Sequence, residues 1–267
     1  MESRVVLGLT AEKRDSITVE EIAARVGVTR TYAAKIAHTL SRKRWLQRIG
    51  RGRYLLNPPE NGPDPVPDTN AFRVGSHLID PYAFAYSTAA TLHGLLTQNP
   101  RTFHLATPRK AERSLQEPVA FRLVHVSPPR FFGLQRVQRH GTEFWVTDLE
   151  KTMLDAVDRP DLLGGMAHAV QVLHAAKPRL DYRKLLNYVR RTGNRSLGQR
   201  IGHLLTRIRP EVPVPESFTA KLLRDAGPPW IRLGPVREFG REGDHDRLWH
   251  VIVNVPEERL LGEVRVR

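Results

Sequence analysis

The sequence contains no cysteine among its 267 residues. This absence excludes disulfide bonds, thiolate zinc sites, iron–sulfur clusters and cysteine nucleophiles. There is also no run of eighteen apolar residues, so no membrane-spanning helix is expected. The first ten residues include Glu2 and Arg4 and lack a continuous apolar core, which argues against a secretory signal peptide. Together these absences predict a cytoplasmic protein.

The chain also lacks the short motifs of common enzymes. It has no Gly-x-Ser-x-Gly elbow, no phosphate-cradling Gly-x-x-x-x-Gly-Lys loop and no dinucleotide fingerprint. His168 and His174 are six residues apart, so on a helix they lie on different faces, unlike the i, i+4 pair of a zinc helix. We therefore expect no catalytic residue, no cofactor and no metal site.

One acidic cluster competes with that interpretation, and it consists of Asp148, Glu150, Asp155, Asp158 and Asp161. It is the only support for a Mg²⁺-dependent nuclease. However, Asp148 stands where a helix is expected to start and Glu150 falls in the first turn, where acids favour the helix dipole. Helix capping is therefore the favoured interpretation, and a DNA-targeted nuclease stays as an alternative function.

Negative charge is scarce in this chain. The 42 Lys and Arg residues against 28 Asp and Glu give a formal net charge of +14, which favours a polyanionic partner. Residues 1–57 carry a net +7, residues 58–70 carry −3, and the much longer remainder carries +10. Because Arg outnumbers Lys 34 to 8, a base-composition bias is the alternative explanation for the second half.

Residues 18–40 have the pattern of two short helices joined by a glycine. Thr18 and Glu21 have the spacing of a capping box, which predicts a helix that starts at Val19. Gly27 is expected to end this helix. The residues expected to be buried on it are Ile22, Ala23 and Val26.

The second helix of this pair is expected to follow Thr29 as its N-cap. Spacing of i, i+3, i+4 and i+7 predicts a buried stripe of Ala33, Ile36, Ala37 and Leu40. The opposite face is rich in hydrogen-bonding groups and cationic at both ends, which suits reading base edges while flanking charges hold phosphates. The DNA-binding residues predicted on this helix are Thr29, Arg30, Thr31, Tyr32, Lys35, His38 and Arg42.

A predicted β-hairpin follows the two helices. Residues 45–49 and 53–56 are β-type runs joined by the Gly-Arg-Gly turn at 50–52. A hairpin in this position is the wing of a winged helix-turn-helix domain, and its DNA-contacting residues are expected to be Arg48, Arg51 and Arg53. The alternative is that the helix-turn-helix is only a packing motif in a domain that does not touch DNA.

Residues 58–70 contain five of the twenty prolines and no aromatic residue, which predicts a semi-rigid linker. We therefore expect a winged helix-turn-helix domain in residues 1–57 and a second domain in residues 71–267. Each of these segments has its own apolar pattern, so each is expected to fold as a domain.

The second domain changes its pattern along the chain. A helix is expected over residues 82–96, and strands are expected over 102–107, 121–126 and 143–147. Helices follow over 148–157, 165–176, 182–192 and 197–207, with one more strand over 249–255. This order divides the domain into a strand-rich part (71–147), a helical part (148–209) and C-terminal strands (210–267). The predicted fold class is α+β, with an N-terminal winged helix-turn-helix domain and a larger mixed α/β C-terminal domain.

Five segments carry a family resemblance, namely residues 86–107 (YSTAATLHGLLTQNPRTFHLAT), 146–155 (VTDLEKTMLD), 159–165 (RPDLLGG), 199–205 (QRIGHLL) and 249–255 (WHVIVNV). In this order they resemble the AbiEi family of antitoxin transcriptional regulators of type IV toxin–antitoxin systems. The resemblance implies a repressor of its own operon that binds double-stranded operator DNA. It also implies a neighbouring nucleotidyltransferase-like toxin of the AbiEii class, which the protein counters without necessarily forming a stable complex.

Residues 183–209 contain eight cations and no acid, which predicts a second basic surface. This surface is expected to bind nucleic acid or an acidic or RNA-binding partner, and a solvated face in an arginine-biased protein is the alternative. Its candidate residues are Arg183, Lys184, Arg190, Arg191, Arg195, Arg200 and Arg207. The alternative function is therefore a toxin- or RNA-binding interaction module whose DNA binding is only regulatory.

Overall fold

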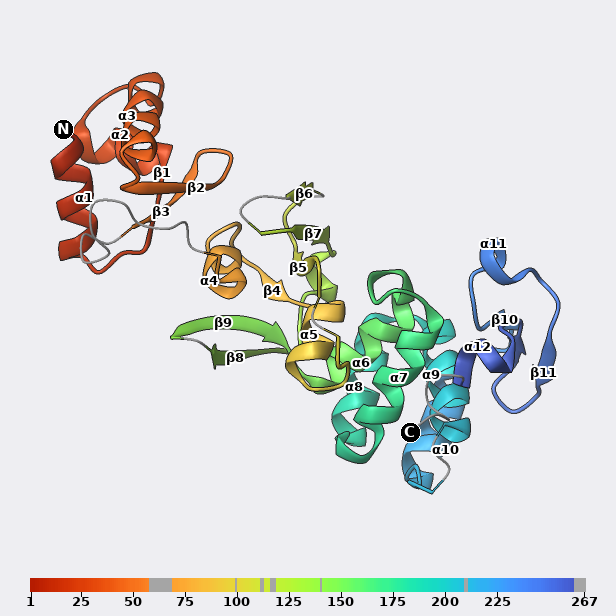
Figure 1. Ribbon diagram of the computed structural model, residues 1–267. Helices are drawn as coiled ribbons and strands as arrows, with labels where there is room; N and C mark the ends of the chain where they lie inside the picture. Colours follow the sequence, from red (N-terminus) through yellow and green to blue (C-terminus); the bar gives the residue numbers. More distant parts are fainter. Residues whose placement is uncertain are drawn as a thin grey trace.

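The computed structural model describes residues 1–57, 69–98, 100–110, 113–115, 119–139, 141–208 and 211–261. Most of the predicted linker, residues 58–68, lies outside the described residues. The elements follow one another from a small unit of helices and strands, through a central sheet, to a helical bundle and a small C-terminal sheet (Figure 1). This is the mixed α+β architecture that the sequence predicts. Within the described ranges, no helix has the length and apolar character that crossing a membrane requires.

Residues 1–57 form α1 (Glu2–Ala11), β1 (Ser16–Thr18), α2 (Val19–Val26), α3 (Arg30–Arg42), β2 (Leu46–Gly50) and β3 (Arg53–Leu56). Thr18 and Glu21 make the predicted capping box, and Gly27 ends α2 with a φ of 73°. The side chain of Thr29 accepts a hydrogen bond from the backbone N–H of Tyr32 and so caps α3. Both predicted helices and the predicted hairpin are therefore present.

The core of this unit also needs α1 and β1, which the sequence analysis misses. The helix α1 buries Val5, Val6 and Leu9 and has no side-chain N-cap, so it lacks the start signal that identifies α2 and α3. The strand β1 is only three residues long and pairs with β3. The predicted stripe of α3 is buried against them, at Ala33, Ile36, Ala37 and Leu40.

A six-stranded sheet forms the centre of the molecule, in the order β6-β7-β5-β4-β9-β8. Its elements are α4 (Ala71–Ser76), β4 (Ala83–Phe84), α5 (Tyr86–Leu92), β5 (Phe103–Thr107), β6 (Arg113–Leu115), β7 (Phe121–His125), β8 (Leu134–Arg139) and β9 (Thr142–Thr147). The three predicted strands are confirmed as β5, β7 and β9. The edge strands β6 and β8 escape prediction.

The prediction of one helix over residues 82–96 is wrong in part. Ala83 and Phe84 form the strand β4, which pairs with β5 on one side and β9 on the other, and the helix α5 covers only Tyr86–Leu92. A short apolar run does not reveal from sequence whether it is a central strand or a buried helical turn. Here, pairing with two neighbouring strands decides for the strand.

The helices after the sheet agree with the prediction. They are α6 (Leu149–Asp158), α7 (Met166–Ala176), α8 (Tyr182–Thr192) and α9 (Arg195–Arg207). The last part of the chain adds α10 (Glu216–Asp225), β10 (Ile231–Arg232), α11 (Val236–Phe239), β11 (Asp244–Asp246), β12 (Val251–Val253) and α12 (Glu257–Leu261). The predicted C-terminal strand is present as β12, the centre of a three-stranded sheet, but helices share this region with the strands.

The two faces of the central sheet belong to different cores. In β5, Leu105 packs in the apolar cluster that includes Val74 of α4, whereas the next residue, Ala106, packs in the cluster formed by α6 to α9. In β7, Leu123 and Val124 divide in the same way. Successive side chains of a strand point to opposite faces. The sheet therefore separates a core that it shares with α4 from a core that it shares with α6 to α9.

The hairpin of the first unit packs directly against α4. Ile49 and Leu55 lie in the same apolar cluster as Val74 and Leu78. Arg73 of α4 also donates a hydrogen bond of 3.3 Å to the carbonyl of Leu56. The first unit is therefore attached to the sheet through packed side chains.

A close contact joins α9 to the C-terminal sheet. A Cβ atom at Gly202 would lie 2.2 Å from Cζ3 of the buried Trp249, so only glycine leaves room for the indole ring. Gln199, one turn earlier, donates a hydrogen bond of 3.1 Å to the Trp249 carbonyl. Two sequence segments that are far apart in the chain, 199–205 and 249–255, thus form one packing unit.

Candidate functional site

The exposed face of α3 carries most of the predicted DNA-binding residues. Tyr32 is 46% exposed, which is unusual for a large aromatic side chain. The other exposed side chains on this face are Thr31, Lys35, His38 and Arg42. The side chain of Thr29 is instead used as the helix cap. The α3 surface therefore presents one aromatic and several hydrogen-bonding or cationic groups to solvent.

Arg30 has a partner on the neighbouring helix. Its Nε donates a hydrogen bond of 2.7 Å to Oε1 of Glu20 in α2. This hydrogen bond from Arg30 holds the pKa of the Glu20 carboxyl below its ordinary value. Both side chains are mostly exposed, at 67% and 60%, so water screens the pair. Arg30 is thus accessible but held at the start of α3.

The three arginines of the hairpin differ in their surroundings. Arg51 is exposed at the turn, and the exposed Arg48 makes only a 3.4 Å contact with the carbonyl of Gly50. The guanidinium of Arg53 lies 3.5 Å from the carbonyl of His77, after α4. The structure therefore leaves Arg48 and Arg51 available at the hairpin and directs Arg53 toward the second region.

The members of the second basic set differ in their surroundings. Lys184 lies against two acids, Arg190 pairs with Asp225 at 2.6 Å, and the guanidinium of Arg191 lies 4.3 Å from the centre of the Phe132 ring. Arg200 donates a hydrogen bond of 2.9 Å to the carbonyl of Arg232. The exposed members are Arg183, Arg190, Arg191, Arg195 and Arg207, whereas Lys184 and Arg200 are half-buried.

The acidic cluster is used to hold helices in place. Asp148 caps α6 and accepts a 2.8 Å hydrogen bond from the Tyr188 hydroxyl, while Glu150 accepts one from the Asp181 backbone N–H. Lys184 Nζ lies 3.1 Å from Asp148 and 2.9 Å from Glu150. Across the described ranges, no three His, Asp or Glu side chains come together as a metal site.

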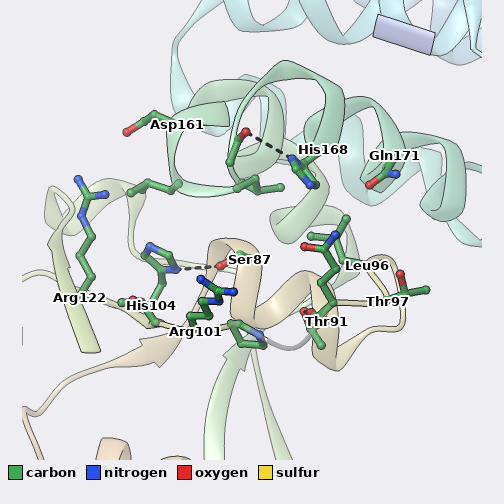
Figure 2. A pocket seen from close by; sticks show the side chains of 16 residues that line it. Ser87, Thr91, Leu96, Thr97, Arg101, His104, Arg122, Asp161, His168 and Gln171 are labelled. Carbon is green, nitrogen blue, oxygen red and sulfur yellow. Dashed lines mark hydrogen bonds between the residues drawn. The ribbon is translucent and has the colours of Figure 1, made fainter. Parts of the chain in front are cut away.

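A pocket of about 740 Å³ lies between the sheet and α7 (Figure 2). Arg101, Arg122 and His104 lie on one side of it, and Leu96, Thr97 and Gln171 lie on the other. The strands β5 and β7 are parallel, and His104 and Arg122 are register partners on them. Both side chains therefore leave the sheet on the same face.

His104 is the most buried polar group of the pocket, with only 9% of its surface exposed. Its Nδ1 shares a 2.9 Å hydrogen bond with Oγ of Ser87. Burial, helped by the positive charge of Arg122, lowers the pKa of His104 to about 4. The imidazole is consequently neutral at pH 7.

This pocket was not predicted from the sequence, although two strands share a sequence pattern that relates to it. Residues 103–107 (FHLAT) and 121–125 (FRLVH) share the pattern Phe-x-Leu, with a basic or imidazole residue at the second position. Two such strands paired in parallel place those second residues side by side. The pairing itself is a tertiary contact, so the pattern gains meaning only when the two strands are known to be neighbours.

We predict that His104 makes the stability of the protein pH-dependent. Its folded pKa lies below its unfolded value, so its contribution is complete above about pH 6.5 and is lost as the pH falls from 6.5 toward 4. In urea titrations, H104Q should lose about 1–3 kcal/mol less unfolding free energy than the wild type over this interval. The exposed-histidine variant H38Q should follow the wild type. Parallel curves for wild type and H104Q would contradict the assignment.

Comparison with known proteins identifies the central part of the chain. Residues 82–207, which include the whole pocket, match the family model of the AbiEi antitoxin C-terminal domain. None of the curated proteins compared with the chain matches it. The crystal structure of the RV2827C protein from Mycobacterium tuberculosis is similar in fold, with a TM-score of 0.62 and 17% sequence identity over 98% of this chain and 94% of that chain. Residues 82–207 therefore belong to the AbiEi antitoxin C-terminal domain family, which confirms the resemblance that the sequence motifs indicate.

Proposed function

We propose that the protein is the antitoxin and DNA-binding autorepressor of a toxin–antitoxin operon. Residues 1–57 act as the winged helix-turn-helix domain, with α3 as recognition helix and the β2–β3 hairpin as wing. The observation that carries this proposal is the α3 face, where Tyr32, Lys35 and His38 are exposed beside a hairpin turn with a free Arg51. This surface is joined to an AbiEi antitoxin domain.

We propose different tasks for the two parts of this surface. Thr31, Tyr32 and Lys35 occupy the first turns of α3, opposite its buried stripe, so they enter the major groove and contact base edges. Arg48 and Arg51 of the hairpin, with Arg42 at the end of α3, contact the phosphate backbone. Specificity then comes from the helix and salt-dependent affinity from the hairpin.

Glu20 opposes DNA binding through Arg30. Its carboxylate holds the Arg30 guanidinium at 2.7 Å and adds a negative charge beside the α3 surface. Arg30 must leave Glu20 to reach a phosphate or a base.

We predict opposite effects for the two partners of this pair. In gel-shift titrations with operator DNA, R30A should bind roughly 10- to 100-fold more weakly, because it loses a direct contact. E20Q should bind severalfold more tightly at low salt, because it frees Arg30 and removes a repulsive charge. E12Q is the matched control. Glu12 pairs with Arg25 at a distance of 2.6 Å, and neither residue belongs to α3. Unchanged affinity in both R30A and E20Q would remove Arg30 from the interface.

A second prediction separates the hairpin arginines. R51A should reduce the slope of log affinity against log salt by about 1, because one phosphate contact is lost. R53A should leave the slope unchanged, because Arg53 reaches toward the His77 carbonyl. Equal slopes for wild type and R51A would place the hairpin away from DNA.

The antitoxin function is assigned to the domain that follows. We propose that it counters an AbiEii-like nucleotidyltransferase toxin encoded in the same operon, that it acts in the cytoplasm, and that it catalyses no reaction itself. The support for this assignment is the family to which residues 82–207 belong. The nuclease alternative loses its basis, because the two acids at the start of α6 face Lys184.

We predict that repression and protection separate in the full-length chain. Because Ile49 and Leu55 pack against α4, cutting the chain would expose apolar surface, so point variants are the better test. The double variant Y32A/K35A should derepress a promoter reporter and still protect cells that express the toxin. K221A, at an exposed position of α10, should keep both activities. Loss of protection together with repression would place antitoxicity in DNA binding.

Co-purification distinguishes the interaction module from this proposal. A full-length chain that captures the neighbouring toxin in a stable complex, with protection lost when the complex is disrupted, would favour direct toxin binding. Protection without a complex is the result that our proposal expects.

A further inference from the structure

The pocket between the sheet and α7 has no part in the proposed DNA contacts. Its volume of about 740 Å³ falls within the range of small-molecule sites. It lies on the face of β5 and β7 that points to the helical core, whereas the hairpin packs on the opposite face. A ligand in this pocket would therefore act apart from the α3 surface.

One side of the pocket carries more positive than negative charge, with Arg101 and Arg122 against the single acid Asp161. Arg101 and Arg122 are exposed, and neither forms an ion pair with another residue in the described part of the chain. The acid at the rim, Asp161, is already held by Arg159 through two hydrogen bonds of 2.9 and 2.8 Å. Two arginines that line one space, while the only acid there is bound by Arg159, favour an anionic ligand.

His104 supplies a third group on the same side. Its Nδ1 faces Ser87, so its Nε2 is the ring atom that is left for the pocket (Figure 2). When the Ser87 hydroxyl donates its proton to Nδ1, the neutral ring carries its own proton on Nε2 and donates it to a ligand oxygen. Arg101, Arg122 and His104 together provide several donors for the oxygens of one anion.

The other side of the pocket is neutral. Leu96 offers an apolar surface, and Thr97 and Gln171 offer a hydroxyl and an amide (Figure 2). An amide side chain both donates and accepts hydrogen bonds, as a heterocyclic base edge requires. The pocket thus places a cationic end opposite an end that fits a neutral ring.

We propose that this pocket binds a mononucleotide, with its phosphate monoester held by Arg101, Arg122 and His104 and its base directed toward Leu96 and Gln171. A monoester carries up to two negative charges and exposes three terminal oxygens, which suits the three donating side chains Arg101, Arg122 and His104. The size of the cavity accommodates one nucleotide.

Isothermal titration calorimetry on the full-length chain tests this proposal with AMP, GMP, CMP and UMP as probes. At least one mononucleotide should bind, its nucleoside should bind much more weakly, and inorganic phosphate should compete. R101Q and R122Q should each weaken binding by about tenfold or more. R139Q, at an exposed position on the edge strand β8, removes the same charge elsewhere and should bind normally.

Several outcomes would overturn the proposal. These are no binding of any mononucleotide at millimolar concentration, equal binding of the nucleosides, or normal binding by both R101Q and R122Q in variants whose thermal unfolding matches the wild type. Arg122-dependent binding of oligonucleotides that lack a terminal phosphate would also overturn it, because the site would then recognise phosphodiesters. Operator binding by R122Q is expected to be unchanged, so a failure here is distinguishable from a failure of the proposed DNA-binding function.

Discussion

The link between Lys184 and two buried acids holds the sheet and the helical bundle together. Asp148 directly follows β9 and caps α6, and Glu150 lies two residues further in the first turn, with side chains only 8% and 5% exposed. Two buried carboxylates without a cationic partner would be strongly destabilising. Lys184 on α8 meets both, and Tyr188 adds a hydrogen bond to Asp148. Because this cluster fixes α6 and α8 to the end of β9, the positions of the bundle and of the pocket beside it depend on it.

The central sheet separates the two proposed activities by the alternation of side chains along its strands. Leu105 points toward the core that continues through α4 to Ile49 and Leu55 of the hairpin. His104, one residue earlier, points to the opposite face and lines the pocket. The hairpin and the pocket therefore lie on different faces of the central sheet.

Local sequence signals predict the fold wherever they are strong. The capping box at Thr18, the glycine at 27 and the Thr29 cap locate α2 and α3, and the Gly-Arg-Gly turn locates the hairpin. The signals fail for α1, which has no side-chain cap, and for β4, whose two residues become a strand only because β5 and β9 flank them. For the site, sequence periodicity correctly predicts that the α3 residues are exposed, because buried and exposed positions of a helix follow from its period.

The sequence alone determined the two helices and the hairpin of residues 18–56, the strands β5, β7 and β9 and the helices α6 to α9 of the second region, and the family to which that region belongs. Only the tertiary structure decided which charged groups are available. Arg53 is turned toward His77, Lys184 is used between Asp148 and Glu150, and Arg101 and Arg122 are left free beside His104. The reason is that periodicity reports which face of an element is polar, whereas the partner of a charge comes from another part of the chain, and its position depends on packing between elements.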